Sequence, residues 1–169
     1  IHKKSKCVVQ MTLTTYDEDL CKIIEPKVAT TKQRFETLEI FRDNNIPTVV
    51  WFSPILPFIN DSKENLEGIL EYCIQAKVHG IINFGMGLTL REGDREDFYD
   101  ALDRFFPGMR SRYHQKYGYA YELYSDNNKE LMEIFKTRCQ KHGILYEPKD
   151  VFTYLKAFPE EPFEQLSLF

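Results

Sequence analysis

The sequence lacks the cysteine spacing that metal centres and redox motifs use. Its four cysteines are Cys7, Cys21, Cys73 and Cys139, and no two are close enough for a CxxC-type motif. Each lies in an apolar stretch, where a free cysteine behaves as a small buried hydrophobic residue. We therefore expect four reduced thiols in a cytoplasmic protein, and no metal site.

Long apolar runs and a dominant charge of one sign are also missing. No run approaches the roughly 18 apolar residues of a membrane span, and no secretory signal pattern is visible, so we expect no membrane partner. The net charge is -4 and the pI about 5.6, which argues against a wholly basic, nonspecific nucleic-acid binder. The 169 residues, 43% of them hydrophobic, are enough for one domain with its own core.

Apolar strands alternate with helices over the first ninety residues. We expect strands at 7–13, 48–52 and 81–84. Capping boxes at Thr30 with Gln33 and at Asp61 with Glu64 begin the two longer helices between them. This βαβαβ order predicts an α/β fold with a parallel sheet and right-handed crossovers. Three strands leave two sheet edges, which proteins normally cover, so we expect preceding strands to be missing or the chain to self-associate through the edge before Cys7.

The chain changes character after Leu90 and becomes mostly helical. Helices are predicted from Asp94 to Phe105, over 128–142 and over 149–155. A shorter helix is predicted after the Pro107-Gly108 turn, ending near Tyr117, and an aromatic, polar loop follows at 118–127. The predicted organisation is a βαβαβ core over 1–90, a helical extension packed on it over 91–158, and an extended tail over 159–169.

Polar residues follow the predicted strands, where parallel α/β proteins bind their ligands. The candidate cofactor-binding residues are Thr12, Thr14, Thr15, Arg34, Ser53 and Asn83. Hydroxyls and amides hold ribose or carboxylate groups, and an arginine pairs with a carboxylate bidentately. Each residue also fits a structural role, because threonine at a strand end commonly caps a turn or helix.

The segment LTTYDEDLCKIIEP, the helix with Arg34, and SPILPFIND together resemble the radical S-adenosylmethionine family. The similarity is to its spore photoproduct lyase-like, or DNA-repair-photolyase-like, branch. GLTLREG at 87–93 and FFPG at 105–108 also look like bacterial members of that group.

The resemblance implies a partial TIM-like (β/α)6 barrel with a 4Fe-4S cluster on a CxxxCxxC loop. The cluster reduces S-adenosylmethionine to a 5′-deoxyadenosyl radical. Thr14 and Thr15 then match ribose or carboxylate contacts, Arg34 a carboxylate contact, and Ser53 and Asn83 the ends of the last two strands. CxxxCxxC is absent, and a cluster needs converging thiolates. We therefore expect the C-terminal half of such a barrel, inactive alone. S-adenosylmethionine and the 4Fe-4S cluster are expected in the full-length parent, and neither is expected to be bound to this chain.

The tail carries a second resemblance. Its residues Gln165, Leu166, Ser167, Leu168 and Phe169 are similar to the bacterial sliding-clamp binding pentapeptide QL(S/D)LF. In that motif the leucine and phenylalanine enter an apolar pocket and the glutamine anchors the other end. The alternative is a tail that folds back on its own domain.

A basic and aromatic stretch also precedes the predicted loop. It alternates Arg110, Arg112, His114 and Lys116 with Tyr113, Tyr117, Tyr119 and Tyr121. Such residues track phosphates and stack on bases, or form a solvated helix face with an aromatic underside.

Three functions follow from these patterns. The first is a fragment of a radical S-adenosylmethionine enzyme that repairs or modifies nucleic acid. The second is a non-catalytic module recruited to the sliding clamp. The third, a cofactor-free TIM-type lyase or isomerase, is disfavoured because no lysine or paired carboxylates stand at the strand ends.

Overall fold

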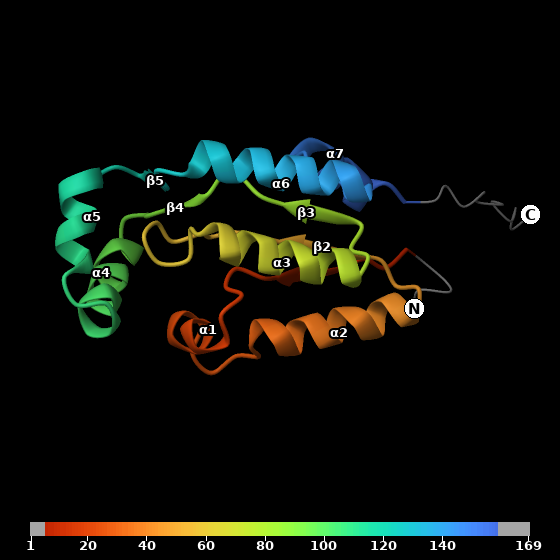
Figure 1. The fold of residues 1–169 in the computed structure, drawn as a ribbon, viewed down its shortest axis with the longest axis horizontal. Helices are drawn as coiled ribbons and strands as arrows, with labels where there is room; N and C mark the ends of the chain where they lie inside the picture. Colours follow the sequence, from red (N-terminus) through yellow and green to blue (C-terminus); the bar gives the residue numbers. More distant parts are fainter. Residues whose placement is uncertain (1–5, 159–169) are drawn as a thin grey trace, which may run out of the picture.

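Three parallel strands and the helices that connect them form the centre of the molecule (Figure 1). The computed structural model describes residues 6–158. The strands lie side by side in the order β1 (Val9–Thr12), β2 (Thr48–Trp51) and β3 (Gly80–Ile82). The connecting helices are α1 (Glu18–Ile24), α2 (Thr31–Asp43) and α3 (Lys63–Gln75). The predicted α/β fold with a three-stranded parallel sheet is confirmed, and the sheet is not a closed barrel.

The helix starts follow the capping chemistry of the sequence. Gln33 N–H donates to Thr30 Oγ1 (3.5 Å) and Thr30 N–H donates to Gln33 Oε1 (2.9 Å), so the capping box of α2 is confirmed. At α3 the predicted cap is wrong by one residue. Ser62, rather than Asp61, accepts the N–H of Asn65 at 3.1 Å.

One face of the sheet packs against α2, α3 and α6 (Asn128–His142) to form the main core. The predicted α3 stripe is buried there, and it includes Leu66, Ile69, Leu70 and Cys73. Burial raises the pKa of the Cys73 thiol and raises that of Cys139 to about 12. Both thiols therefore stay protonated at neutral pH and serve as packing groups.

The opposite face is covered only in part, by α7 (Pro148–Lys156). Val151 of α7 is buried against Val49 and Ile82. In Figure 1, α7 lies beside β2 and β3, at the end of the molecule away from α4 and α5. Phe152 of α7 also reaches Trp51, the last residue of β2, with ring centroids 6.1 Å apart. On this face Gln10 is exposed, and Thr12 and Ser53 are partly exposed.

The two outer edges of the sheet differ. Leu145 bridges β3, because Ile81 N–H donates to Leu145 O (2.8 Å) and Leu145 N–H donates to His79 O (3.1 Å). The β3 edge, for which the sequence shows no partner strand, is therefore covered by the backbone of Leu145. At β1, Val9 and Leu13 donate toward β2, so the backbone groups of Gln10 and Thr12 point outward. Within residues 6–158 no strand pairs with that edge.

A second, smaller core stands beyond the carboxyl ends of the strands (Figure 1). It is built by α4 (Asp94–Phe105), α5 (Met109–Tyr117) and the antiparallel pair β4 (Gly87–Thr89) and β5 (Glu122–Tyr124). The prediction of a loop at 118–127 is wrong in part, because this segment contains β5. Leu123 is buried between exposed neighbours, an alternation too short to be recognised in the sequence.

The ring of Tyr16 packs directly on the backbone of α3 at Gly68. A Cβ atom at Gly68 would lie 2.3 Å from Tyr16 Cγ. Alanine ordinarily stabilises a helix by about 1 kcal/mol relative to glycine. Here we expect Gly68→Ala to lower the free energy of unfolding by about 1–2 kcal/mol, because the ring must move. Chemical denaturation followed by circular dichroism measures the change.

The matched control is the same substitution in a Tyr16→Ala background. With the ring gone, Gly68→Ala should raise the free energy of unfolding by up to about 1 kcal/mol. The same effect in both backgrounds would show that the ring does not restrict position 68.

Candidate functional site

Two of the six predicted cofactor-binding residues lie together on the sheet face that α7 covers only in part. Met11 and Phe52 face the main core, so their neighbours Thr12 and Ser53 lie on the opposite face. Thr12 stands directly across from Trp51 in the register. The hydrogen bonds found within residues 6–158 leave both hydroxyls unused. Both are therefore able to bind a ligand.

Thr14 and Thr15 are buried in a polar network instead. Asn65 Nδ2 and Asn60 Nδ2 both donate to the backbone oxygen of Thr14, at 2.9 and 3.1 Å. Asn60 Nδ2 also donates to Thr15 Oγ1 at 3.1 Å, and Asn65 Oδ1 accepts the N–H of Tyr16 at 2.6 Å. These contacts fasten the end of β1 to the connection between β2 and α3. Sequence reasoning missed both asparagines, whose partners are distant in the chain.

The Asn83 side chain also forms hydrogen bonds to the backbone of neighbouring segments. Its Nδ2 donates to Phe52 O (2.6 Å) and its Oδ1 accepts the N–H of Gly85 (2.7 Å). The side chain is buried. These bonds turn the chain away from the sheet, which explains why β3 ends at Ile82 and not at Phe84 as predicted.

Arg34 binds a carboxylate that belongs to the chain itself. Its guanidinium pairs with Glu25 through three contacts of 3.0–3.2 Å and donates to Thr12 O at 2.9 Å. The Arg34 side chain is 12% exposed and that of Glu25 is 25% exposed. The Glu-Pro segment and the arginine helix, both noted in the sequence, are thus partners. Arg34 also covers the outward carbonyl at the end of β1.

The uncovered part of the sheet face includes three residues that sequence reasoning did not select. We call the surface formed by Gln10, Thr12, Trp51, Ser53 and Phe84 the open half. Trp51 Nε1–H donates to Gln10 Oε1 at 2.9 Å, and the ring of Phe84 lies 6.3 Å from that of Trp51. A polar residue inside an apolar strand, Gln10, was the available signal. Aromatic rings beside hydroxyl and amide groups suit a planar, polar ligand.

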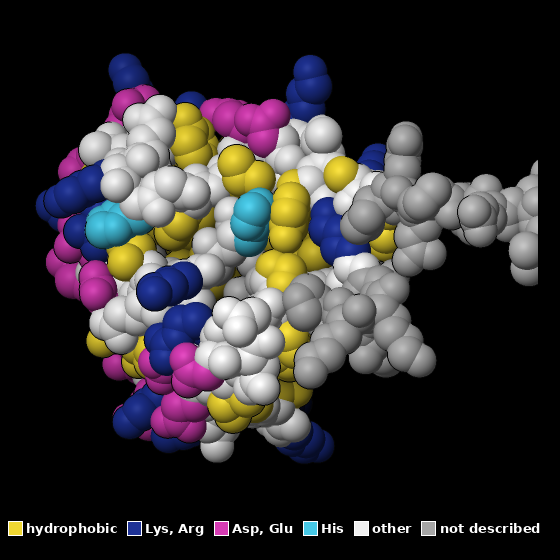
Figure 2. Space-filling view, turned by 90° about the vertical axis from the view of Figure 1, so that its right-hand side faces the viewer, with side chains coloured by type: hydrophobic (Ala, Val, Ile, Leu, Met, Phe, Trp, Pro, Cys, Tyr) yellow, Lys and Arg dark blue, Asp and Glu magenta, His cyan; other side chains and the backbone are white. Residues whose placement is uncertain are grey.

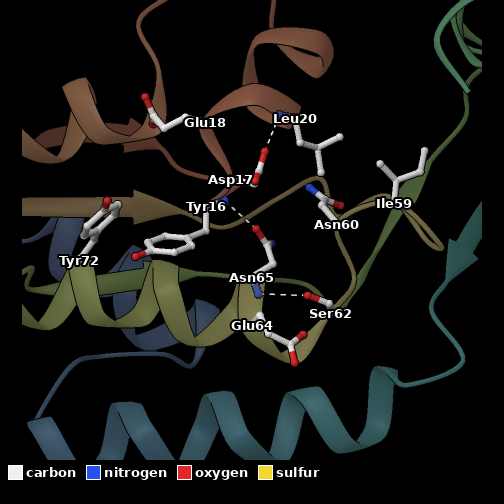
Figure 3. Close-up of a pocket in the computed structure, with 10 residues that line it drawn as sticks. All are labelled: Tyr16, Asp17, Glu18, Leu20, Ile59, Asn60, Ser62, Glu64, Asn65 and Tyr72. Carbon is white, nitrogen blue, oxygen red and sulfur yellow. Dashed lines mark hydrogen bonds between the residues drawn. The ribbon is translucent and has the colours of Figure 1, made fainter.

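A pocket of about 450 Å³ lies beside the start of α3 (Figure 3). Tyr16 and Tyr72 stand along α3 on one side, and Asn60 and Ile59 lie across from them (Figure 3). Its charged lining residues are Asp17, Glu18 and Glu64. The N–H of Glu64 itself and the Ser62 hydroxyl lower the pKa of Glu64. Because the only charged groups in its lining are carboxylates, this pocket repels phosphate and carboxylate groups.

A pocket of about 470 Å³ at the opposite end of the molecule is lined by Lys77, His79 and His142 among others. Figure 2 shows histidine side chains standing apart there, among small hydrophobic groups and charged residues. His79 stacks on Tyr154 with ring centroids 3.6 Å apart. Burial, and next to it the charge of Lys6, lower the pKa of His79. His79 therefore packs as a neutral ring.

The basic and aromatic stretch lies mostly on α5, and its charges are partly compensated. Arg110 pairs with three α4 carboxylates, the shortest contact being 2.8 Å to Asp103. Tyr113 is buried and donates to Pro57 O at 2.7 Å. Arg112 stands 3.8 Å from the centre of the Phe58 ring. Of the two interpretations of this stretch, the arrangement fits the solvated helix face with an aromatic underside.

Two kinds of site are absent from the described part of the chain. Between residues 6 and 158, no three His, Cys, Asp or Glu side chains come together to hold a metal ion. No helix in that range is both long and apolar enough to span a membrane. The predicted clamp-binding residues 165–169 lie outside the described residues.

Comparisons with known proteins give only distant relatives. No protein-family model matches the chain, and no solved structure matches it significantly. It is 30% identical over 109 residues to the uncharacterized proteins Rv2578c of Mycobacterium tuberculosis and Mb2609c of Mycobacterium bovis. The match covers 64% of this chain and 32% of each relative, about a third of their length. These similarities assign no family and no activity.

Proposed function

We propose that the chain forms the C-terminal part of a radical S-adenosylmethionine enzyme of the spore photoproduct lyase-like group, acting on nucleic acid. One observation carries the proposal. Within residues 6–158, Thr12 and Ser53 present hydroxyls without hydrogen-bond partners at the carboxyl end of a parallel sheet. Ligands of parallel α/β proteins bind at this end of the strands.

The outer edge of β1 also supports a sheet that continues into a partial barrel. Gln10 and Thr12 direct backbone groups away from β2, so a further strand has donors and acceptors to meet. Arg34 already occupies the carbonyl of Thr12, which limits such pairing to the residues before it. The open half would then face the inside of the barrel.

The residues present fit the organic cofactor better than the cluster. Thr12 and Ser53 would hold hydroxyl or carboxylate groups of S-adenosylmethionine, the source of a 5′-deoxyadenosyl radical when bound. Arg34, engaged by Glu25, acts as a positioning residue for β1. The described residues offer no ligands for the cluster. Cys21, Cys73 and Cys139 are buried, and no three His, Cys, Asp or Glu side chains among these residues come together to bind a metal ion. We assign no step of the chemistry to a cluster on this chain.

Binding of S-adenosylmethionine tests the proposal. Because both hydroxyls are accessible in the chain by itself, and contrary to the expectation from the sequence, titration calorimetry on the chain should detect binding. Thr12→Val and Ser53→Ala should each weaken it about 2- to 10-fold, as expected for one lost hydrogen bond. Thr89→Val, which removes an exposed hydroxyl on β4, should leave the affinity unchanged. Absence of binding, or an equal loss in all three variants, would count against the cofactor site.

Recruitment to a sliding clamp is the second candidate, and the pentapeptide at 165–169 is the observation that favours it. Surface plasmon resonance on an immobilised bacterial clamp should show binding of the full chain. Deleting residues 165–169 should abolish it, because the apolar anchors Leu168 and Phe169 are lost. A free QLSLF peptide should compete. Unchanged binding after the deletion would refute this role. The cofactor-free alternative gains nothing, since Thr, Ser and Asn occupy the strand ends.

A further inference from the structure

We propose that Gln10 and Trp51 form a recognition site for a nucleobase that presents a carbonyl oxygen. The site lies on the open half, beside the hydroxyls of Thr12 and Ser53. The inference rests on the proposed function, because it names the kind of substrate group that this sheet face takes. It has its own evidence in the geometry of one hydrogen bond.

That hydrogen bond fixes which way the Gln10 amide points. The indole N–H of Trp51 is only a donor, so the group 2.9 Å from it must be the amide oxygen of Gln10. The amide nitrogen then points away from Trp51 with both of its hydrogens. No acceptor within residues 6–158 takes these hydrogens. The exposed end of Gln10 is therefore a pure donor.

A pure donor selects among bases. Glutamine ordinarily reads adenine bidentately, using its oxygen and its nitrogen together. Trp51 already occupies the oxygen here, so the bidentate contact with adenine is blocked. The two remaining hydrogens suit the carbonyl oxygens of uracil, thymine, cytosine or guanine, which adenine lacks.

Aromatic surface for the base lies next to the amide. Phe84 and Phe152 stand 6.3 and 6.1 Å from Trp51, at interplanar angles of 50° and 65°. Neither ring therefore stacks flat on the indole. Phe84 is 56% exposed, so its own ring is accessible. Base-on-aromatic stacking contributes about 1–3 kcal/mol in single-strand binding proteins.

Among the described residues, the two cations near the open half are engaged in other contacts, which favours recognition of the base over the phosphate. Arg34 pairs with Glu25. Lys6 donates to the carbonyl oxygens of Tyr154 and Ala157 at the end of α7. The open half itself contains no charged side chain. Affinity for a strand should therefore depend on bases more than on salt.

Trp51 is the single tryptophan of the chain, so tryptophan fluorescence reports binding at this site. Trp51 fluorescence would be titrated with UMP, AMP, an oligo(dU) strand of about 12 nucleotides, and an abasic strand of that length. We expect UMP to quench the emission and AMP to bind at least about 5-fold more weakly. The abasic strand, with the same phosphates, should cause no quenching. Tighter binding of oligo(dU) than UMP would identify a strand as the source of the base, and equal binding a free nucleotide.

Gln10→Glu is the sharpest variant, because a carboxylate still accepts from Trp51 but offers no donor. UMP affinity should fall about 10-fold or more, with an unchanged circular dichroism spectrum. Gln115→Glu, the same change at an exposed site on α5, should bind UMP as the original chain does. Equal binding of UMP and AMP, quenching by the abasic strand, or an unaffected Gln10→Glu would overturn the inference. Loss of S-adenosylmethionine binding with intact base discrimination would overturn only the proposed function.

Discussion

Two amide side chains that converge on one backbone oxygen hold together the carboxyl end of the parallel sheet. Asn60, from the loop after β2, and Asn65, in the first turn of α3, both donate to Thr14 O. Leaving such a buried oxygen without a donor costs about 1–3 kcal/mol. Because the contact joins the end of β1 to the β2–α3 connection, it sets Thr12 and Ser53 on one fixed edge of the sheet.

The other contacts at this edge determine which polar groups the open half offers to a proposed ligand. Arg34 and Glu25 neutralise each other beside β1, and α7 packs on Val49, Ile82 and Trp51 while Gln10 stays exposed. The acidic pocket beside Tyr16 repels the phosphate of a nucleotide and the carboxylate of S-adenosylmethionine. What remains is a surface with two hydroxyls, one oriented amide and aromatic rings. Its chemistry suits a neutral, planar, hydrogen-bonding group.

The sequence predicts the parallel sheet well, because its strands are apolar and its longer helices carry caps such as Thr30. It also places Thr12 and Ser53 correctly at strand ends. It could not separate them from Thr14, Thr15 and Asn83, whose polar groups are used by residues distant in the chain. The three-residue strand β5 was missed because a single buried Leu123 gives no periodicity. The role of Gln10 depends on a contact 41 residues away.

Nuclear magnetic resonance mapping tests most directly the claim that the open half, and not the acidic pocket, receives the ligand. The single indole N–H of Trp51 and the side-chain amide of Gln10 are resolvable signals, as are the backbone signals of Gly68 and Tyr72 by the pocket. On addition of UMP, we expect the Trp51 and Gln10 signals to shift while those of Gly68 and Tyr72 stay in place. Shifts confined to Gly68 and Tyr72 would contradict the account.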